Sequence, residues 1–453
     1  MHVLGIDIGS SFIKSSILDL ERGVVGDTHI VPAPGFVEAQ GNIREIPIDA
    51  LTCMVKGIID KSFTDAGLDG IIFSTQMHGY VLLDESGKPT GNYVSWQDMR
   101  GLDFSGGNGG DAIAAINARV PGHVLSLSGV TLRNNLSLVP LFCARQKGEI
   151  RENLSLAMLG DAMIRFLTGT GAPVHPTNAA STGLYNLKAN DWNNELIKIL
   201  DLGVLAFPRV YGGKEPAAFY EHSSGKRVPI YAAVGDHQAA IFGANAGDGC
   251  VVINIGTGGQ ICYIDKGLQY GNFETRPYFN GMSLRVLPQL PSGRSLNILM
   301  DFIVDVGTHL FDAADNGAND SSIWDRINKL AEQAEGESAG NGPAPLTVKM
   351  DFFNFNSSQG GAIEGIGTNN FNAGNLFRSV YAFMAGEYRA AYERLFAEGE
   401  KKASMVVCTG GVLQKTPLLV KKISECFDVP CMPASATEDV MNGLMRLARW
   451  YDS

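Results

Sequence analysis

The chain has 453 residues, which is too long for a single hydrophobic core and predicts two or three folded units. Its 36 Lys and Arg against 47 Asp and Glu give a formal net charge of −11, which argues against a nucleic acid or an anionic membrane as a partner. Seven scattered cysteines without C-x-x-C spacing indicate free thiols, and no leader peptide or long apolar run is recognisable. We therefore expect a cytoplasmic protein that does not span a membrane.

The N-terminal stretch predicts a hairpin. Residues 3–8 and 12–18 are apolar, β-rich runs separated by Gly9-Ser10-Ser11, and Asp7 is set into the first run. A tip made of small residues exposes backbone N–H groups and hydroxyls that can hold phosphate oxygens. Gly-Ser is also a common turn in ordinary hairpins, so the pattern alone leaves both interpretations open.

A group of polar and aromatic residues follows the next strand, which we predict at residues 71–75. Its members are His78, Trp96, Gln97, Asp98 and Arg100, and Gln76 and Met77 lead from the strand into it. Hydrogen-bonding groups beside an aromatic ring suit a polyhydroxylated ligand, whose hydroxyls need paired donors and acceptors. The alternatives are a structural role for His78 and a surface ion pair between Asp98 and Arg100.

The middle of the chain contains one informative turn. Residues 105–111 are Gly-rich and predict a loop, and the pattern of residues 154–167 predicts a helix. Residues 230–234 predict a buried strand that ends at Gly235, and a small-residue helix follows Gln238. Asp236 therefore lies on a strand-to-helix turn, where ligands gather in open α/β sheets. The alternative role for this carboxylate is a helix N-cap.

A second hairpin repeats the first. Residues 251–255 and 260–264 flank Gly256-Thr257-Gly258-Gly259, and aligning the two motifs places Asp7 opposite Asn254. Two copies, each opening about half of the chain, indicate a duplicated architecture whose two tips could hold different phosphates of one nucleotide. A Walker-type loop is excluded because no G-x-x-x-x-G-K-[ST] run occurs, and a dinucleotide fold is disfavoured.

The C-terminal region adds one more candidate site. Residues 335–345 are linker-like, and residues 405–409 predict a strand that enters Gly410-Gly411 before a helix. Bare backbone at a helix start admits a flat ring such as adenine. A tight βα turn without a ligand explains the two glycines equally well.

With these motifs in order, the sequence resembles the FGGY family of carbohydrate kinases, within the actin-like ATPase superfamily, over essentially its whole length. The two phosphate motifs of the family are matched by LGIDIGSSFIKSSILD and NIGTGGQI, and its adenosine motif by CTGGVLQKTPLL. The sugar-site segments of its ketose kinases are similar to STQMHGYVLLD and SWQDMR, and the block with its catalytic Asp is similar to VGDHQAA.

The resemblance implies an α/β fold of the actin-like ATPase (ribonuclease H-like) type, with two duplicated domains, 1–243 and 244–453, flanking a cleft. It implies ATP and Mg²⁺ as cofactors, Asp236 as the catalytic base, and Asp7 and Asp236 at the metal. The residues that it implies for the nucleotide are Ser10, Ser11, Lys14, Gly256, Thr257, Gly258, Gly410, Gly411 and Gln414. Those that it implies for the sugar are Gln76, Met77, His78, Trp96, Asp98, Arg100 and Asp236.

The implied reaction is ATP-dependent phosphorylation of a terminal hydroxyl of a ketose. The run GNFETRPYFNGMSLRV resembles sedoheptulokinase-like members more closely than glycerol kinases. This makes sedoheptulose the first candidate substrate and xylulose or another pentulose the alternative. The implied partner is a small-molecule ketose, with a homodimer as the candidate assembly. Thr416 and residues 439–443 depart from the family pattern, which leaves the nucleotide selectivity open. A sugar-sensing regulator on the same fold and an actin- or chaperone-like switch are the alternatives from other classes.

Overall fold

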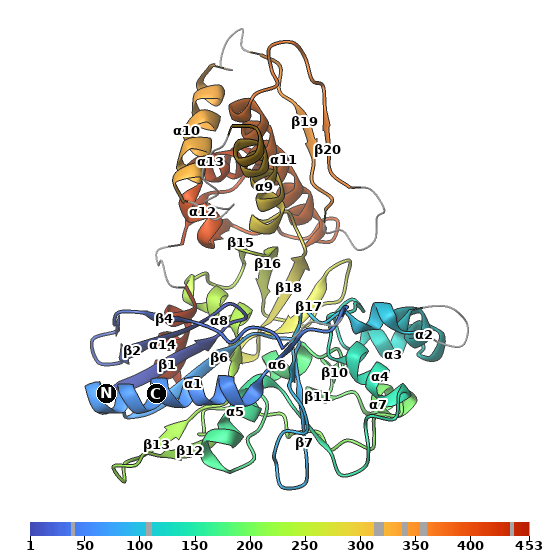
Figure 1. Ribbon diagram of the computed structural model, residues 1–453, viewed down its shortest axis with the longest axis vertical. Helices are drawn as coiled ribbons and strands as arrows, with labels where there is room; N and C mark the ends of the chain where they lie inside the picture. The colour runs from blue at the N-terminus through green and yellow to red at the C-terminus, as the bar shows by residue number, and fades with distance from the viewer. Residues whose placement is uncertain are drawn as a thin grey trace.

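The computed structural model describes residues 1–37, 41–105, 111–311, 321–337, 343–352, 360–434 and 439–452. It shows two halves, each built around a mixed β-sheet, stacked along the long axis of the molecule (Figure 1). Most of the predicted loop at 105–111 and part of the linker-like stretch at 335–345 lie outside the described residues. None of the helices in the described ranges is long and apolar enough to cross a membrane.

The first sheet has a parallel centre. Its strand order is β12 (Ala218–Glu221), β13 (Arg227–Ile230), β6 (Gly70–Thr75), β1 (His2–Ile8), β2 (Phe12–Asp19) and β3 (Val24–Val25), with β4 (His29–Pro32) beside β2 and β14 (Val234–Gly235) beside β6. The strands β1 and β2 form the predicted hairpin, and β6 runs parallel to β1. The predicted strand at 230–234 is wrong as a single element, because β13 ends at Ile230 and β14 resumes at Val234.

The second sheet repeats this arrangement. Its strand order is β17 (Glu274–Pro277), β18 (Ser283–Pro288), β16 (Gly259–Asp265), β15 (Cys250–Ile255), β21 (Met405–Thr409) and β22 (Cys431–Pro433). The strand β15 pairs antiparallel with β16 and parallel with β21, just as β1 pairs with β2 and β6. The predicted duplication is therefore confirmed, and Asp7 and Asn254 hold equivalent places one residue before the end of β1 and β15.

Helices cover the outer face of each sheet. The first sheet packs on α1 (Ile48–Ala66) and α5 (Leu159–Thr168), and the second on α9 (Gly293–Phe311), α10 (Ser321–Glu337), α11 (Ala373–Arg394) and α13 (Pro417–Cys426). The buried residues of α1 are spaced four apart at Leu51, Val55, Ile59 and Phe63, which is the spacing of one helix face. The predicted helix at 154–167 is corrected, because its first residues form β9 (Ser155–Ala157).

Two helices lie between the sheets and join the halves. They are α8 (Asp236–Gly243) and α14 (Asp439–Asp452), whose apolar residues share a core with both sheets. Their backbones touch, because a Cβ on Gly443 would collide with the backbone oxygen of Ala239. Since α14 comes from the end of the chain and packs on β1, β2 and β6, the domain division at 243 and 244 stays a prediction.

The remaining elements are short. A helical region beside the first sheet contains α2 (Ala112–Arg119), α3 (Gly122–Ser126), α4 (Leu138–Gln146), α6 (Pro176–Ala180) and α7 (Asn194–Ile199), and has its own apolar core. Two-stranded sheets pair β5 (Glu45–Ile46) with β8 (Tyr93–Val94), β7 (Val81–Leu83) with β9, β10 (Tyr185–Asn186) with β11 (Asp191–Trp192), and β19 (Thr347–Lys349) with β20 (Ala362–Glu364). The helix α12 (Gly411–Lys415) follows β21 directly.

Candidate functional site

The carboxylate of Asp236 stands at the start of α8, between the two sheets. The strand β14 pairs with the end of β6 through Gly235, and the helix begins at the next residue. The Asp236 side chain accepts a hydrogen bond from the backbone N–H of His237 at 2.7 Å. The cap position is occupied by Gly235, so Asp236 does not take the N-cap role that the sequence left open.

Asp7 and Asp236 form a pair of neighbouring carboxylates. Alternation along β1 puts Asp7 on the same face as Val3, which packs toward α8 and α14. Ser74, its partner on β6, donates a hydrogen bond to Asp7 at 2.7 Å. Burial raises the pKa of Asp236 to about 7, and the negative charge of Asp7 adds to the rise. A divalent cation would relieve this repulsion, and Mg²⁺ needs few protein carboxylates, so the pair fits a magnesium site.

The predicted sugar segment at 76–78 lies next to this pair. The backbone N–H of Gln76 continues the β1–β6 pairing by donating to Ile8 at 2.8 Å, and its buried side-chain oxygen has no partner among the described residues. Met77 packs its sulfur against Gly235, directly before Asp236. The structure therefore brings this segment to the start of α8.

His78 is held in an unusual backbone conformation. Its φ is +66°, and its ring Nδ1 donates to the carbonyl of Ser181 at 2.6 Å. Burial, followed by the charges of Arg133 and Arg276, lowers the pKa of His78 to about 3. The ring is therefore neutral, and with the proton on Nδ1 its Nε2 offers a hydrogen-bond acceptor.

The other predicted sugar residues form a closed cluster in the first half. The buried carboxylate of Asp98 accepts four hydrogen bonds, from the backbone N–H groups of Arg44 and Arg100 and from two side-chain nitrogens of Arg100. Arg100 also pairs with Glu45 at 2.7 Å. These donors fill the acceptor sites of the Asp98 carboxylate. The ion pair is therefore not on the surface, and Asp98 has no acceptor site left for a ligand. The sugar contacts assigned to Asp98, Arg100 and the half-buried Trp96 stay predictions.

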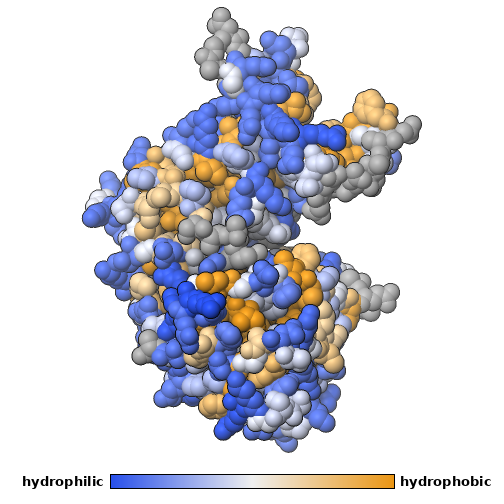
Figure 2. Space-filling model, turned by 90° about the vertical axis from the view of Figure 1, so that its left-hand side faces the viewer, coloured by the Kyte–Doolittle hydropathy of each residue, from blue (hydrophilic) through white to orange (hydrophobic). Residues whose placement is uncertain are grey.

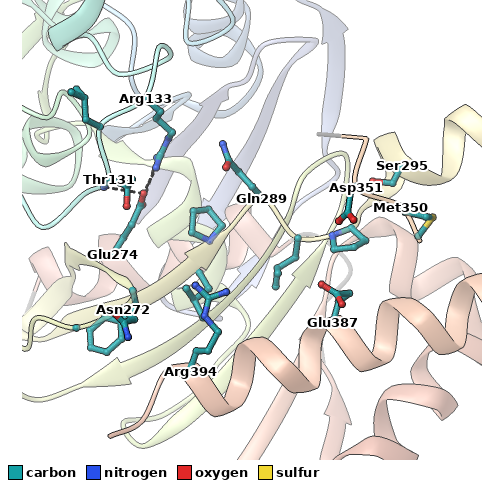
Figure 3. A pocket seen from close by; sticks show the side chains of 17 residues that line it. Thr131, Arg133, Asn272, Glu274, Gln289, Ser295, Met350, Asp351, Glu387 and Arg394 are labelled. Carbon is teal, nitrogen blue, oxygen red and sulfur yellow. Dashed lines mark hydrogen bonds and ion pairs between the residues drawn. The ribbon is translucent and has the colours of Figure 1, made fainter. Parts of the chain in front are cut away.

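A second charged cluster was missed by the sequence analysis. Glu274 on β17 accepts hydrogen bonds from Arg276 at 2.6 and 3.2 Å. It also accepts a hydrogen bond from Arg133 of the first half (Figure 3). Arg276 reaches on to His237, with 3.2 Å between its Nη1 and the ring Nδ1. Glu274 and Arg276 point to the same side of a strand because they are two residues apart, and this was the one signal in the sequence.

The charge of Glu274 is set by its two arginines. Burial alone would raise the pKa of this carboxyl group, but the positive charges of Arg276 and Arg133 outweigh it and hold the pKa at about 2. Arg276 also lowers the pKa of Asp236. The cluster therefore lies within electrostatic reach of the candidate base, and a backbone hydrogen bond of 2.7 Å from Thr275 to Gly129 ties the same strand to the first half.

The two hairpin tips are built as predicted. In the first, Gly9 donates to Phe12 at 3.1 Å across the turn, Ser11 is exposed and Ser10 is half-buried. In the second, Gly256 donates to Gly258 at 2.9 Å, and Thr257 and Gly258 are exposed. Lys14 stands directly opposite Asp7 in the β1–β2 register. Their place at the nucleotide stays a prediction, which the exposed tips support.

The third nucleotide element follows β21. Gly410 has a φ of +101°, and a Cβ there would collide with the carbonyl of Ile255, so only glycine fits. The space that a Cβ would enter at Gly411 is empty within 4 Å, and Gln414 is exposed on α12. This open backbone fits the approach of a flat ring. Of the two departures from the family pattern, Thr416 is buried before α13, and Asp439 accepts a hydrogen bond from Thr409.

A cavity of about 760 Å³ opens between the halves. Its walls come from residues 131–133 of the first half, from β17, β18 and the following turn, and from α11. Arg133 and Glu274 face each other at one end, and the carboxylates of Asp351 and Glu387 lie at the other (Figure 3). The space-filling view shows a notch between the two halves, rimmed by both apolar and polar residues (Figure 2).

A family model and a curated relative each match about half of the length of this chain. The model of the N-terminal domain of the FGGY family of carbohydrate kinases matches residues 2–243, more than half of the chain. A glycerol kinase from Oleidesulfovibrio alaskensis is 32% identical over 253 residues. That match covers 53% of this chain and 50% of the kinase, so the chain matches about half the length of this curated relative.

Solved structures extend the likeness to the whole chain. A ligand-bound xylulose kinase from Lactobacillus acidophilus superposes with a TM-score of 0.81 at 19% identity, covering 99% of this chain and 89% of that one. A glycerol kinase from Plasmodium falciparum, solved with ADP, superposes with a TM-score of 0.82 at 15% identity, covering 100% and 89%. These matches establish the fold, and the predicted actin-like ATPase fold is confirmed.

Proposed function

Because the chain belongs to the FGGY family of carbohydrate kinases, we propose that it transfers the γ-phosphoryl group of ATP to a terminal hydroxyl of a ketose. The observation that carries this proposal is the Asp236 carboxylate, which stands at a helix start between the two sheets with a pKa raised to about 7. A base poised near neutral pH can take a proton from a hydroxyl and still be ionised when the substrate arrives.

In the proposed reaction, the sugar hydroxyl oxygen forms a bond to the γ-phosphorus, its proton passes to Asp236, and the bond to ADP breaks. The transition state of phosphoryl transfer is loose, so the base mainly orients the nucleophile. Mg²⁺ would be held by Asp7 and Asp236 and would neutralise charge on the phosphates. The hairpin tips at Ser10 and Thr257 would supply donors to the phosphates.

The remaining assignments follow the position of each residue. Adenosine would lie against Gly410 and Gly411, and the sugar against Gln76, Met77 and His78. Trp96 would give the aromatic face for the sugar carbons. The unpaired side-chain oxygen of Gln76 supports this assignment, because a buried acceptor without a partner costs free energy unless a ligand fills it.

Sedoheptulose is our first candidate for the ketose, with xylulose or another pentulose as the alternative. The proposal rests on the run from Gly271 to Val286, which resembles sedoheptulokinase-like members. This run supplies β17 and part of the cavity wall, where Asn272 offers a polar group to a long polyol.

The test is a coupled assay of ADP release with Mg·ATP against sedoheptulose, xylulose, ribulose, fructose and glycerol. Asp236→Asn should lower kcat with the preferred sugar by about 10² to 10⁴, the usual contribution of a general base. The matched control is Asp49→Asn, which removes the same charge from the first turn of α1 at an exposed site and should leave kcat within about twofold. An unchanged kcat in Asp236→Asn would reject the base, and nucleotide binding without turnover of any sugar would favour a sugar-sensing regulator.

We also propose that the enzyme works in the cytoplasm as a homodimer. All seven cysteines are unpaired thiols, which suits a reducing compartment. Light scattering of the purified protein tests the assembly, and a monomer at all concentrations would reject it.

A further inference from the structure

Two histidines near Asp236 carry their ring protons on opposite nitrogens. The Nδ1 of His78 faces a carbonyl oxygen, which can only accept, so Nδ1 is the donor and Nε2 the acceptor. The Nδ1 of His237 faces the guanidinium of Arg276, which can only donate, so Nδ1 accepts and the proton sits on Nε2. A ring nitrogen that accepts a hydrogen bond carries no proton, so His237 is neutral in this arrangement.

The donor on His237 has no hydrogen-bond acceptor among the described residues. Its side chain is 8% exposed, and its Nε2 is buried without a partner in the described part of the chain. Buried donors without partners are rare in native proteins because each loses its hydrogen bonds to water. Such a group beside a candidate base is typical of a position that a ligand completes.

Arg276 is held rigidly in the orientation that sets this tautomer. Its Nε and Nη2 both bond to Glu274, which leaves Nη1 aimed at His237. Glu274 is fixed from the opposite side by Arg133, whose Nε is in turn held by Asn135 at 3.0 Å. The planar guanidinium allows both sets of bonds at once, which an ammonium group does not.

The chain of contacts passes twice between the halves. His237 and Arg133 belong to the first half, and Glu274 and Arg276 belong to β17 of the second. All four side chains are largely buried. The bond that fixes the His237 ring is therefore made only when β17 lies against the first half, as it does here.

We propose that Arg276 is a positioning residue that, anchored by Glu274 and Arg133, fixes His237 in the Nε2–H tautomer as a hydrogen-bond donor beside Asp236. His78 then offers an acceptor and His237 a donor. Neighbouring hydroxyls of a polyol could satisfy both together. The kinetic part of this inference rests on the proposed function.

The direct test is the tautomer itself. In protein labelled with ¹⁵N-histidine, long-range proton–nitrogen spectra distinguish a protonated Nδ1 from a protonated Nε2 without any substrate. The chain has eight histidines, and the signal lost in His237→Gln identifies the one of interest. We expect the Nε2–H pattern in the wild type and its partial loss in Arg276→Lys. A protonated Nδ1 in the wild type would overturn the proposal, whether or not any sugar is phosphorylated.

The kinetic test is a double-mutant cycle with the preferred sugar. Arg276→Lys keeps the positive charge beside Glu274 but loses the forked guanidinium that bonds to Glu274 and His237 at once. It should raise KM for the sugar about tenfold, the effect of one lost hydrogen bond. The KM for ATP should stay within about twofold. His237→Gln places an amide N–H near the Nε2 position without a tautomer to set. In the His237→Gln background, Arg276→Lys should raise KM for the sugar about twofold or less. Equal costs in both backgrounds would overturn the proposal.

The matched control is Arg285→Lys. Arg285 is as buried as Arg276 and lies on the adjacent strand β18. Like Arg276 it donates two hydrogen bonds to one glutamate, here Glu400, and it also bonds to Asp265. Its replacement should lower stability without changing KM for the sugar. A rise in KM as large as that of Arg276→Lys would mean that any loss of a buried arginine disturbs the site, which would also reject the positioning role.

Discussion

Two clusters of acidic and arginine side chains in this molecule have similar components, but one lies within a single half and the other joins the two halves. Asp98 accepts hydrogen bonds from Arg100 and from the backbone of Arg44, and Arg100 turns to Glu45, all within the first half. Glu274 accepts from its neighbour Arg276 and from Arg133, which is 141 residues away. The first cluster closes on itself, whereas the second joins the halves and reaches His237 beside Asp236.

The difference also lies in the charge balance. The first cluster has two carboxylates around one arginine, and the second has two arginines around one carboxylate. Losing Asp98 leaves Arg100 with another partner, but losing Glu274 leaves two largely buried guanidinium groups facing each other. Two acid–arginine pairs with the same spacing in the sequence can therefore differ greatly in how much they contribute to stability and function.

The largest expected effect is that of Glu274→Gln on stability. Removing the carboxylate that Arg133 and Arg276 share should lower the free energy of unfolding by about 3–5 kcal/mol, because buried charges lose their counter-charge. Urea denaturation followed by circular dichroism measures this. Glu400→Gln, which leaves Arg285 with Asp265, is the control and should cost about 1 kcal/mol or less. Equal losses in the two variants would contradict the contrast between the clusters.

The same cluster predicts how stability falls in acid. The folded protein holds the pKa of Glu274 at about 2, below the usual 4.5, so the ion pairs contribute fully above pH 4.5 and are lost as the pH falls through about 2. The difference in unfolding free energy between wild type and Glu274→Gln should therefore shrink below pH 4.5. A difference that stays constant down to pH 2.5 would show that Glu274 keeps a normal pKa.

The third prediction concerns the pH dependence of activity. Asp236 must be ionised to accept a proton, and its pKa is raised to about 7. The value of kcat/KM for the sugar should therefore fall about tenfold per pH unit below pH 7 and level off above it. Arg276→Gln removes a positive charge that lowers this pKa, so the profile should move to higher pH, whereas Lys56→Gln on α1 should leave it in place. A flat profile from about pH 5 to 8 would contradict a raised pKa.

The smallest expected effect is that of Asp98→Asn. It should cost about 1 kcal/mol in unfolding free energy, because the amide keeps one acceptor and Arg100 keeps Glu45. The KM for the sugar should change less than about threefold. A tenfold rise in KM at unchanged stability would instead assign Asp98 to the sugar, as the family resemblance implies, and would remove the functional contrast between the two clusters.

Much of the fold was predictable from the sequence because its signals are local. The hairpins around Gly9-Ser10-Ser11 and Gly256-Thr257-Gly258 follow from apolar, β-rich runs on both sides of small residues, and the structure has both. Asp236 at a strand-to-helix turn and Gly410-Gly411 after β21 were also read from a few consecutive residues. Their order along the chain gave the family resemblance, which the matches confirmed.

The tertiary structure alone decided which side chains meet. No spacing in the sequence pairs Arg133 with Glu274, since that contact depends on how β17 packs against the first half. The sequence also does not show that α14 packs against α8, or that the carboxylate of Asp98 accepts its hydrogen bonds from Arg100 and Arg44. Apolar periodicity and the turns of hairpins and helix starts are set within about ten residues, whereas the partners of a buried charge are set by the packing of elements far apart in the chain.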